Sequence, residues 1–542
     1  MRSMAKNDYS VVREEQTLIN RPSFQNRFLS LLELIIVFVF IHTPIYSQTD
    51  CSKTNLPDLP ELTIISITQE TEFAPHCLVS GIIGKEIKFE LRLPEEWNGK
   101  FVFGGGGGFV GGVVNFALSY GALQKGYATV GTNTGHEAHS LDASWANYNM
   151  ERIVNFGHLA VHRTTVTSKH IIEHYYGQKI NKSYFFGCSR GGGQALIEAQ
   201  RYPNDFDGIV AGAPALNWTT SLAAASIQIQ QLMFPDPDNL DYPVLDLDDL
   251  KLIEDSYLAQ CDAMDGIVDG ILNEPDKCDF NIETLLCNGE KNEQCLTQEE
   301  IDAAKAVYDG PKDKIGSLAH GFPFGGESDA AGWPLWHAGG LKYMESLGEY
   351  QAGVESAQSF ESPITPNATW AFSLGIMRHM IYHDSTWSYV NYNFDNFRED
   401  AELAGHTLNA TNPDLSEFRN NGGKLLIYTG WSDCANSPYG IIEYYKNVLA
   451  LDATALEDVK LFLMPGVLHC AGGKGPSLVN WIDEIDNWVE KNENPDQITA
   501  YFLDEKNQIS GSRPICPYPS IPIYDGKGDT RDVKSFTCGD SK

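Results

Sequence analysis

Short hydrophobic runs that stop at glycine-rich or polar turns recur along most of the chain. They occupy residues 100–103, 127–130, 183–186, 424–428 and 459–464. Before them, residues 52–98 alternate apolar and polar positions as half-buried strands do, notably at 62–67 and 86–93. Continuous apolar runs are typical of parallel strands buried on both faces, and ligands bind beyond the carboxyl ends of such strands. The pattern therefore predicts an α/β fold with its chemistry in the turns that follow these runs.

The hydrophobic pattern changes after Pro214 and returns at about Ser385. In between, the sequence is acidic, aromatic and cysteine-bearing, and residues 236–255 are its most acidic part. We interpret residues 219–385 as an inserted second domain. Residues 49–218 and 386–542 then form the two parts of the α/β core.

Composition and charge narrow the class of protein. The chain has 542 residues, of which 42% are hydrophobic and 20% charged, so it can bury a large core and is not mainly disordered. Its formal net charge is −33. Such a charge repels phosphate backbones and anionic membrane surfaces, so we expect no nucleic-acid partner.

The N-terminal region resembles a secretory signal. Residues 34–41 are unbroken hydrophobic sequence that follows Arg21 and Arg27 and precedes Thr43, Pro44 and Ser47. Residues 1–48 are thus predicted to be a signal-peptide region, with a short membrane anchor as the alternative. No apolar stretch reaches 18 residues, and eleven cysteines suit an oxidising compartment. We expect a secreted or periplasmic protein without stable membrane association after cleavage.

Residues 187–191 read Gly-Cys-Ser-Arg-Gly, which matches G-x-S-x-G between an apolar run and a helix-like stretch at 194–200. A sharp strand-to-helix turn of this kind exposes the serine oxygen, and the flanking glycines allow close packing. The bare pattern also occurs in structural tight turns. Its placement favours Ser189 as a nucleophile.

A serine nucleophile needs a base, and the base needs an orienting carboxylate. Asp433 follows the run at 424–428, and His469 follows the run at 459–464. Ser, Asp and His thus occur in the order found in α/β-hydrolases. Asp483 and Asp486 are weaker candidates because they lie in the helix-like stretch 478–490. We predict a Ser189–His469–Asp433 triad.

Two further features adjoin the predicted triad. Cys188 precedes the nucleophile and Cys470 follows the base, so the two either form a disulfide or are unrelated buried thiols. Glycines 104–108 follow the first apolar run and could offer backbone N–H groups to an oxyanion, with Gly105 and Gly106 as candidates. The N–H of Arg190 is the expected second donor. A phosphate-binding loop is disfavoured because no GxxxxGK[ST] is present, and a plain flexible turn is the other alternative.

These motifs together resemble the tannase and feruloyl esterase family. The resemblance runs from about Trp97 to Cys538 and rests on spaced motifs in a constant order. They are the triad with its two cysteines, Gly104–Gly108, Thr134-Gly-His136, Tyr202-Pro203, residues 206–214 and residues 513–519. It implies an α/β-hydrolase core, a lid domain inserted after the nucleophile strand and helix, and a disulfide between Cys188 and Cys470.

An acidic loop in the inserted region predicts a metal site. Asp262, Asp265 and Asp269 lie within eight residues among glycines, and hard oxygen ligands suit calcium. The loop is not an EF-hand, and an acidic surface loop is the alternative. The resemblance implies a structural lid calcium at such a motif, with carbonyls at positions corresponding to Ile267 and Ile271 as further ligands.

The family resemblance also implies pairings for the other cysteines. They are Cys51 with Cys77, Cys261 with Cys278, Cys287 with Cys295, and Cys516 with Cys538. Cys434 remains free beside the predicted catalytic acid. No role is assigned to it, since a free cysteine commonly behaves as a small buried hydrophobe.

The expected function is a secreted serine carboxylic-ester hydrolase. By resemblance its substrate is a small aromatic ester of hydroxycinnamate or gallate type, free or attached to a plant polymer. Trp333, Trp336, Phe372 and Trp387 could line an acyl pocket or simply form lid core. Arg190 stands where we would expect a small or acidic residue. The alternatives are hydrolysis of another aromatic ester, such as a phthalate-type monoester, and a non-catalytic binding protein on the same scaffold.

Overall fold

The structure is a computed structural model that describes residue 51, residues 56–346 and residues 364–540. The predicted signal-peptide region, 1–48, lies outside the described residues. In the part that is described, no helix combines the length and the apolar character that a membrane crossing requires.

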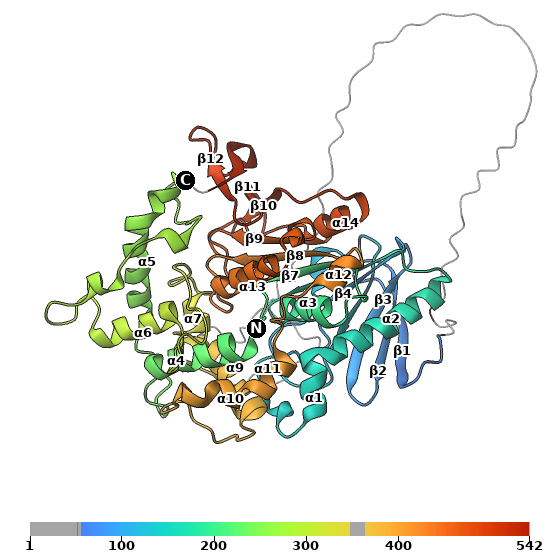
Figure 1. The fold of residues 1–542 in the computed structure, drawn as a ribbon, viewed down its shortest axis with the longest axis horizontal. Helices are drawn as coiled ribbons and strands as arrows, with labels where there is room; N and C mark the ends of the chain where they lie inside the picture. The colour runs from blue at the N-terminus through green and yellow to red at the C-terminus, as the bar shows by residue number, and fades with distance from the viewer. Residues whose placement is uncertain (1–50, 52–55, 347–363, 541–542) are drawn as a thin grey trace, which may run out of the picture. The chain divides into compact units, whose positions relative to one another are not determined.

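A nine-stranded sheet forms the centre of the fold (Figure 1). Its strands follow one another in the order β1-β2-β3-β5-β4-β6-β7-β8-β9. Neighbours from β1 to β5 pair antiparallel, and neighbours from β5 to β9 pair parallel. The strands are β1 (Leu62–Glu70), β2 (His76–Ile83), β3 (Ile87–Pro94), β4 (Lys100–Gly104), β5 (Ala128–Thr132), β6 (Lys182–Cys188), β7 (Gly208–Gly212), β8 (Lys424–Gly430) and β9 (Val459–Met464).

The parallel strands are buried on both faces, as their continuous hydrophobic runs predict. In β4, Phe101 and Phe103 join the core on one face and Val102 joins the core on the other. Helices α2 (Ala160–Tyr176), α3 (Arg190–Arg201) and α13 (Pro438–Leu451) contribute to the first core. Helix α14 (Trp481–Lys491) contributes to the second, where Trp481 stacks on Tyr428 with ring centroids 4.3 Å apart.

The apolar runs at 100–103, 127–130, 183–186, 424–428 and 459–464 are all strands of this sheet. Strand β2 lies in the alternating region 52–98 without having been singled out, and β7 was not predicted from the pattern. Strand β7 has the sequence Gly-Ile-Val-Ala-Gly, so it is short and weakly hydrophobic. Both of its end glycines are required by packing. A Cβ on Gly208 would lie 2.7 Å from Ile485, and one on Gly212 would lie 2.3 Å from the Tyr428 ring. The same close packing that makes β7 central therefore weakens its signal in the sequence.

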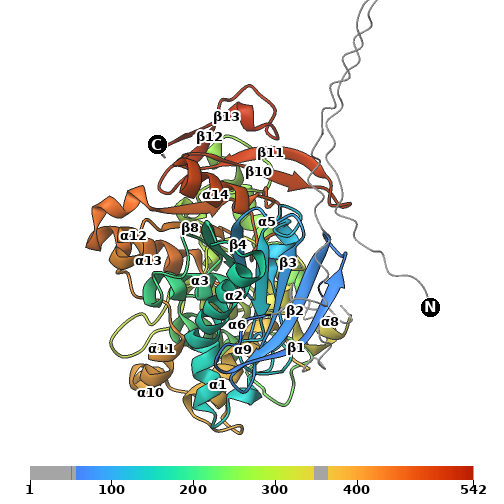
Figure 2. The same ribbon diagram turned by 90° about the vertical axis from the view of Figure 1, so that its right-hand side faces the viewer.

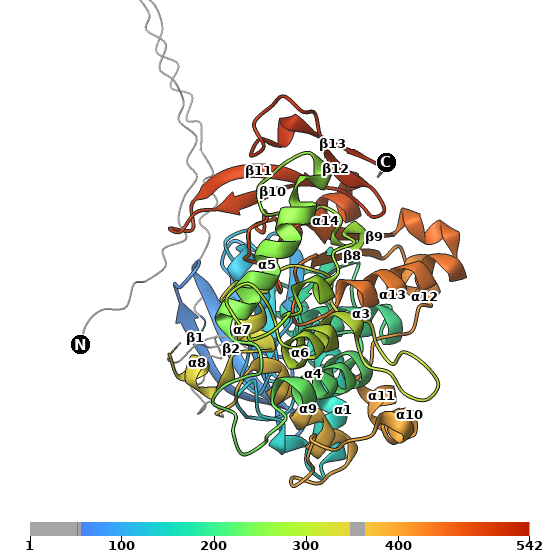
Figure 3. The same ribbon diagram turned by 90° about the vertical axis from the view of Figure 1, so that its left-hand side faces the viewer.

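Between β7 and β8, the described residues form helices joined by loops, and they add no strand to the sheets. Figure 3 shows α4, α5, α6 and α9 in front of the sheet. The helices are η5 (Trp218–Ala224), α4 (Ala225–Met233), α5 (Leu247–Cys261), η6 (Asp262–Asp265), η7 (Pro275–Lys277), η8 (Ile282–Leu285), α6 (Gln298–Asp309), α7 (Trp333–Trp336), α8 (Gly340–Ser346), α9 (Ala368–Ile376), η9 (Met377–Ile381), η10 (Phe394–Asn396), α10 (Phe397–Asp400), α11 (Glu402–Leu408) and α12 (Ser416–Asn420).

This helical region shares one hydrophobic core with parts of the chain outside it. Phe109 and Phe156 precede β6, yet they belong to the same buried cluster as the helices of this region. Leu408 of α11 belongs to that cluster too, although it lies beyond the predicted boundary at 385. We refer to the helical region as the lid. The boundaries at 219 and 385 stay a prediction, because packing is continuous across both.

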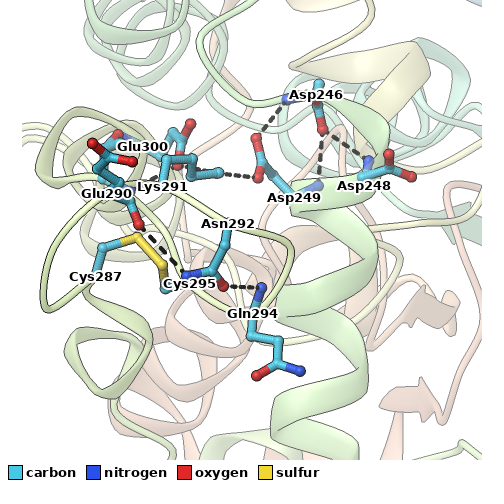
Figure 4. A network of polar contacts seen from close by, with 11 residues as sticks. Asp246, Asp248, Asp249, Cys287, Glu290, Lys291, Asn292, Gln294, Cys295 and Glu300 are labelled. Carbon is cyan, nitrogen blue, oxygen red and sulfur yellow. Dashed lines mark hydrogen bonds and ion pairs between the residues drawn. A yellow bond between two sulfur atoms is a disulfide. The ribbon is translucent and has the colours of Figure 1, made fainter.

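One lid loop is held by a disulfide and by charge (Figure 4). Cys287 and Cys295 close the loop, and Lys291 between them pairs with Asp249 of α5 and Glu300 of α6. Asp249 and Glu300 are also the third residues of N-terminal capping boxes. A single lysine therefore links the first turns of two lid helices.

The remaining elements connect or extend the core. Two small two-stranded sheets close the chain, and Figure 2 shows them above the main sheet. Their strands are β10 (Ile498–Leu503) with β11 (Ile509–Ile515), and β12 (Ile521–Tyr524) with β13 (Phe536–Gly539). The other helical segments are η2 (Phe116–Tyr120), η3 (Ser144–Ala146), α1 (Met150–Val154), η4 (Asn155–Leu159), η11 (Ala453–Glu457) and η12 (Val533–Ser535).

Candidate active site

Ser189 lies at the turn between β6 and α3 and has a backbone conformation that few serines adopt. Its φ is 61° and its ψ is −120°. This strained conformation is typical of a serine held out at a strand-to-helix elbow. A Cβ on Gly187 would lie 2.6 Å from the carbonyl carbon of Gly191, so the sequence can make this turn only with glycine there.

Asp433 and His469 follow the neighbouring strands β8 and β9 and are hydrogen-bonded to each other. His469 Nδ1 lies 3.0 Å from each carboxylate oxygen of Asp433. Asp433 is buried, and its Oδ1 also accepts the backbone N–H groups of Ala435 at 2.8 Å and Asn436 at 2.9 Å. The loop itself therefore holds the carboxylate in place, and the carboxylate orients the imidazole.

The Cys188–Cys470 disulfide connects the serine turn to the histidine loop. The two Cα atoms are 5.9 Å apart, and each cysteine is the chain neighbour of Ser189 or His469. His469 Nε2 is buried and has no hydrogen-bond partner among the described residues, which include Ser189. The three predicted residues thus meet at the same edge of the sheet, with the His–Asp hydrogen bond formed and no Ser–His hydrogen bond.

The structure contains all five disulfides that the resemblance implied. Besides Cys188–Cys470 they are Cys51–Cys77, Cys261–Cys278, Cys287–Cys295 and Cys516–Cys538. Cys434 is the free and buried cysteine, as expected. Burial raises the pKa of its thiol well above the ordinary value, which disfavours the reactive thiolate.

The glycine-rich loop packs against the first turn of α3, but its N–H groups are used differently from the prediction. The Gly105 N–H donates to the Phe186 carbonyl at 2.8 Å. The Gly106 N–H donates to Gln194 Oε1 at 3.1 Å. Neither amide is free to bind an oxyanion in this structure. Gln194, which the sequence analysis did not single out, acts here as the acceptor that fixes the loop.

One of the four lid aromatics contacts the histidine, and a second lies beside the first. Trp336 meets the His469 ring edge-on, with centroids 4.9 Å apart, and Phe372 stacks beside Trp336 at 6.3 Å. Trp333 instead packs on Tyr308 in the lid interior. Trp387 stacks with Tyr382 in a separate aromatic group. Only Trp336 and Phe372 therefore remain candidates for an acyl pocket.

The acidic lid loop contains a carboxylate with an unsatisfied oxygen. Asp265 Oδ1 accepts the Ile267 N–H at 3.0 Å, while Oδ2 is buried without a partner. Burial, reinforced by the charges of Asp269 and Asp262, raises the pKa of Asp265 to about 6. The carbonyl groups of Ile267 and Ile271 accept no hydrogen bond from the described residues. An orphaned carboxylate oxygen and two free carbonyls are ligands that suit calcium.

Other charges already engage part of this loop. Asp269 pairs with Arg513 of β11, and Asp262 Oδ1 accepts the Gly270 N–H at 2.9 Å. Within the described residues, the three aspartates do not form a trio whose ligand atoms all lie within 4.8 Å of one another. A cation bound here would therefore need carbonyl oxygens in addition to carboxylates.

One such trio does occur elsewhere in the described part of the chain, formed by His162, Glu198 and Asp205. His162 Nδ1 lies 2.6 Å from Asp205 Oδ2. Glu198 is buried, and burial together with Asp205 raises its pKa well above the ordinary value. A proton held by Glu198 is enough to relieve the repulsion between the two carboxylates, so the trio does not by itself require a metal ion.

Comparison with known proteins places these features in a family. The sequence profile described as "Tannase and feruloyl esterase" matches residues 76–539. The chain is 30% identical over 529 residues to mono(2-hydroxyethyl) terephthalate hydrolase from Piscinibacter sakaiensis, with 85% of this chain and 84% of that protein covered. It is 29% identical over 472 residues to feruloyl esterase B from Aspergillus niger, with 83% of each covered.

Solved structures agree with the sequence comparisons. Feruloyl esterase B from Aspergillus oryzae superposes with a TM-score of 0.75 at 26% identity, covering 89% of this chain and 98% of that one. Tannin acyl hydrolase from Aspergillus niger shares the fold with a TM-score of 0.67, covering 90% of this chain and 93% of that one at 22% identity. The predictions of an α/β-hydrolase fold and of this family are thereby confirmed. The chain belongs to the tannase and feruloyl esterase family and is a carboxylic ester hydrolase.

Proposed function

We propose that this protein hydrolyses esters of aromatic acids through an acyl-enzyme formed on Ser189. The observation that carries the proposal is the Asp433–His469 pair, which a disulfide ties to the strained serine turn. Hydrogen bonds from its own loop hold Asp433, so His469 has a defined ring orientation. This arrangement matches the requirements of nucleophilic ester cleavage.

In the proposed reaction, Ser189 Oγ attacks the ester carbonyl carbon while His469 Nε2 takes its proton. The imidazolium then gives that proton to the leaving alcohol, and the ester C–O bond breaks. Water attacks the acyl-enzyme with His469 again as base, which releases the acid and regenerates the serine. Asp433 stabilises the imidazolium and keeps Nε2 directed at the serine. Because Nε2 has no other acceptor or donor, no competing bond has to break first.

The proposed oxyanion donors are the Arg190 N–H and one amide of the glycine loop. Arg190 is the first residue of α3, and the first N–H groups of a helix have no intrahelical acceptor. Since Gly105 and Gly106 donate elsewhere, the second donor moves to Gly107 or Gly108. Their N–H groups donate to no acceptor within the described residues.

The aromatic acid specificity rests on the lid and on the relatives. Trp336 offers apolar surface beside His469, and Phe372 extends that surface, which suits a planar acyl group. The related proteins named above are called feruloyl esterase and mono(2-hydroxyethyl) terephthalate hydrolase. We therefore place hydroxycinnamate and gallate esters first, free or attached to a plant polymer, and a phthalate-type monoester second.

Calcium and secretion complete the proposal. Calcium would be held by Asp262, Asp265 and Asp269 with the carbonyls of Ile267 and Ile271, and it would stabilise the lid without taking part in ester chemistry. Five disulfides suit an oxidising compartment, which supports export of the protein to the periplasm or the medium.

The test is a panel of feruloyl, galloyl and terephthaloyl esters with the purified protein and its Ser189→Ala variant. We expect one aromatic class to be hydrolysed with a kcat/KM at least tenfold above the others. The variant should lose about 10⁴-fold or more in kcat while keeping its melting temperature. Retained hydrolysis in the variant would overturn the serine mechanism. Binding of an ester by the wild type without turnover would favour the non-catalytic alternative.

A further inference from the structure

Arg190, the residue after the proposed nucleophile, is a fully buried cation. Its side chain is 1% exposed, and no ion pair links it to a carboxylate within the described residues. Its guanidinium carbon lies 4.2 Å from the ring centroid of Phe156 and 5.2 Å from that of Trp218. Contact with aromatic rings suits a guanidinium better than an ammonium, because the guanidinium is planar and more weakly hydrated. Burial, with a smaller effect of Arg201, lowers the pKa of Arg190 to about 9, so it remains charged at neutral pH.

The guanidinium binds backbone carbonyls in a neighbouring helical turn. Its Nη2 donates to the carbonyls of Phe156 and Gly157, the latter at 2.9 Å. Both residues lie in η4, a π-helical turn between α1 and α2. Such a wide turn interrupts the regular i to i+4 pattern, so its carbonyls can accept from another donor. Arg190 thus connects the start of α3 to a turn that lies more than 30 residues earlier in the chain.

The first turn of α3 needs such an anchor because it is nearly devoid of side chains. Gly191, Gly192 and Gly193 follow Arg190, and a Cβ on Gly192 would lie 2.1 Å from the Gly212 carbonyl oxygen. Glycine is thus required for packing, yet it is among the poorest helix formers and has the freest backbone. Arg190 and Gln194 are the side chains that border these glycines. Gln194 fixes the glycine-rich loop, and Arg190 fixes the start of the helix.

We propose that Arg190 is a positioning residue whose side chain holds the Ser189–Arg190 peptide in place. The Arg190 N–H is thereby kept where it can donate to the oxyanion. The role rests on the proposed function, since it concerns the same ester cleavage. The guanidinium Nη2 reaches two carbonyls while the group contacts two aromatic rings, a combination that the compact ammonium of lysine cannot reproduce in full. The side chain acts through its own backbone amide, so it affects the transition state rather than substrate binding.

The test compares Arg190→Met and Arg190→Lys with Arg201→Met. Arg201 is on the same helix and also donates to a backbone carbonyl, that of His406, but at the far end. Hydrolysis of 4-nitrophenyl butyrate gives kcat and KM. Inhibition by phenylboronic acid, which forms a tetrahedral adduct with an active serine, reports on the oxyanion site, and inhibition by ferulic acid reports on ground-state binding.

For Arg190→Met we expect kcat to fall about 10- to 100-fold with KM changed less than about threefold. Inhibition by phenylboronic acid should weaken by a similar factor, whereas inhibition by ferulic acid should not change. Arg201→Met should match the wild type in all these measurements. If Arg190→Met does not fold, Arg190→Lys carries the test, with a smaller loss in kcat and boronate affinity expected. Wild-type kcat and boronate affinity would overturn the inference, as would a raised KM with unchanged kcat. Ser189→Ala is assayed alongside to separate two kinds of failure. If Ser189→Ala remains active, the proposed function itself is wrong. If Ser189→Ala is inactive while Arg190→Met behaves like the wild type, only the proposed role of Arg190 is wrong.

Discussion

The loop that carries Asp433 and the lid loop from Asp262 to Ile271 both contain buried carboxylate oxygens. The two loops differ in how they compensate the cost of burying that charge. Asp433 accepts two backbone N–H groups from its own loop and contacts His469 with both oxygens. Asp265 accepts one N–H and leaves its other oxygen buried and unpaired. All the partners that the candidate catalytic acid needs are thus supplied by the fold itself. The lid loop instead needs a proton or a cation from outside.

The largest effect should come from Asp433→Asn. The asparagine oxygen can still accept the loop N–H groups, so the fold should persist, but the charge that stabilises the imidazolium is lost. We expect kcat to fall by about 10³- to 10⁴-fold with little change in melting temperature. Asp414→Asn is the matched control, since Asp414 accepts an N–H from its own turn on the surface. Near-normal kcat in Asp433→Asn would mean that another acid orients His469.

The next effect concerns the disulfide that ties the catalytic loops together. Replacing Cys188 and Cys470 with alanine removes a cross-link between residues 282 positions apart, whereas replacing Cys287 and Cys295 removes one between residues 8 positions apart. The chain-entropy estimate is about 5 to 6 kcal/mol for the first pair and a little under half of that for the second. Urea unfolding measures both values. Under conditions in which the protein stays folded, only replacement of Cys188 and Cys470 should also lower kcat. An equal loss of kcat in both double variants would contradict a role for the Cys188–Cys470 disulfide in Ser–His geometry.

Chelation should affect the lid loop and leave the Asp433 loop unchanged. We expect EDTA to lower the melting temperature by about 2 to 5 °C, because a cation bound only by the folded state stabilises it by mass action. Added calcium should restore it and magnesium much less so. Differential scanning fluorimetry with metal analysis of the purified protein is the measurement. If the protein contains no calcium and chelation leaves melting unchanged, the loop is an acidic surface loop.

The smallest effect should be a pH dependence in chelated protein. The pKa of Asp265 is about 6 in the folded state against an ordinary 3.8, so the folded state holds a proton that the unfolded state has lost. The free energy of unfolding should therefore fall as the pH rises from about 4 to 6, by up to about 2 kcal/mol, and stay lower above that. Asp265→Asn cannot ionise and should lack this fall, while Asp302→Asn, at an exposed position of α6, should retain it. Identical pH profiles for wild type and Asp265→Asn would exclude the raised pKa.

The fold class, the family and the residues of the candidate triad could all be predicted from the amino-acid sequence. Each of these depends on short-range pattern: a continuous apolar run predicts a buried parallel strand, and the turn after it carries the polar side chain. The serine turn needs Gly187 and Gly191 because the chain doubles back on itself within a few residues. The cysteine pairs followed from the family resemblance rather than from the residues alone.

Which of the predicted groups are available for chemistry depends on tertiary packing and could not be predicted. Gly105 and Gly106 lie in a glycine-rich loop that suits oxyanion donors. Their N–H groups instead donate hydrogen bonds to a neighbouring strand and to the Gln194 side chain. Trp333 and Trp336 are separated by three positions, yet only Trp336 contacts His469. The physical reason is common to these cases. Whether an amide is free, a ring faces the site or a cation is buried depends on neighbours that are remote along the chain, and local sequence carries no record of them.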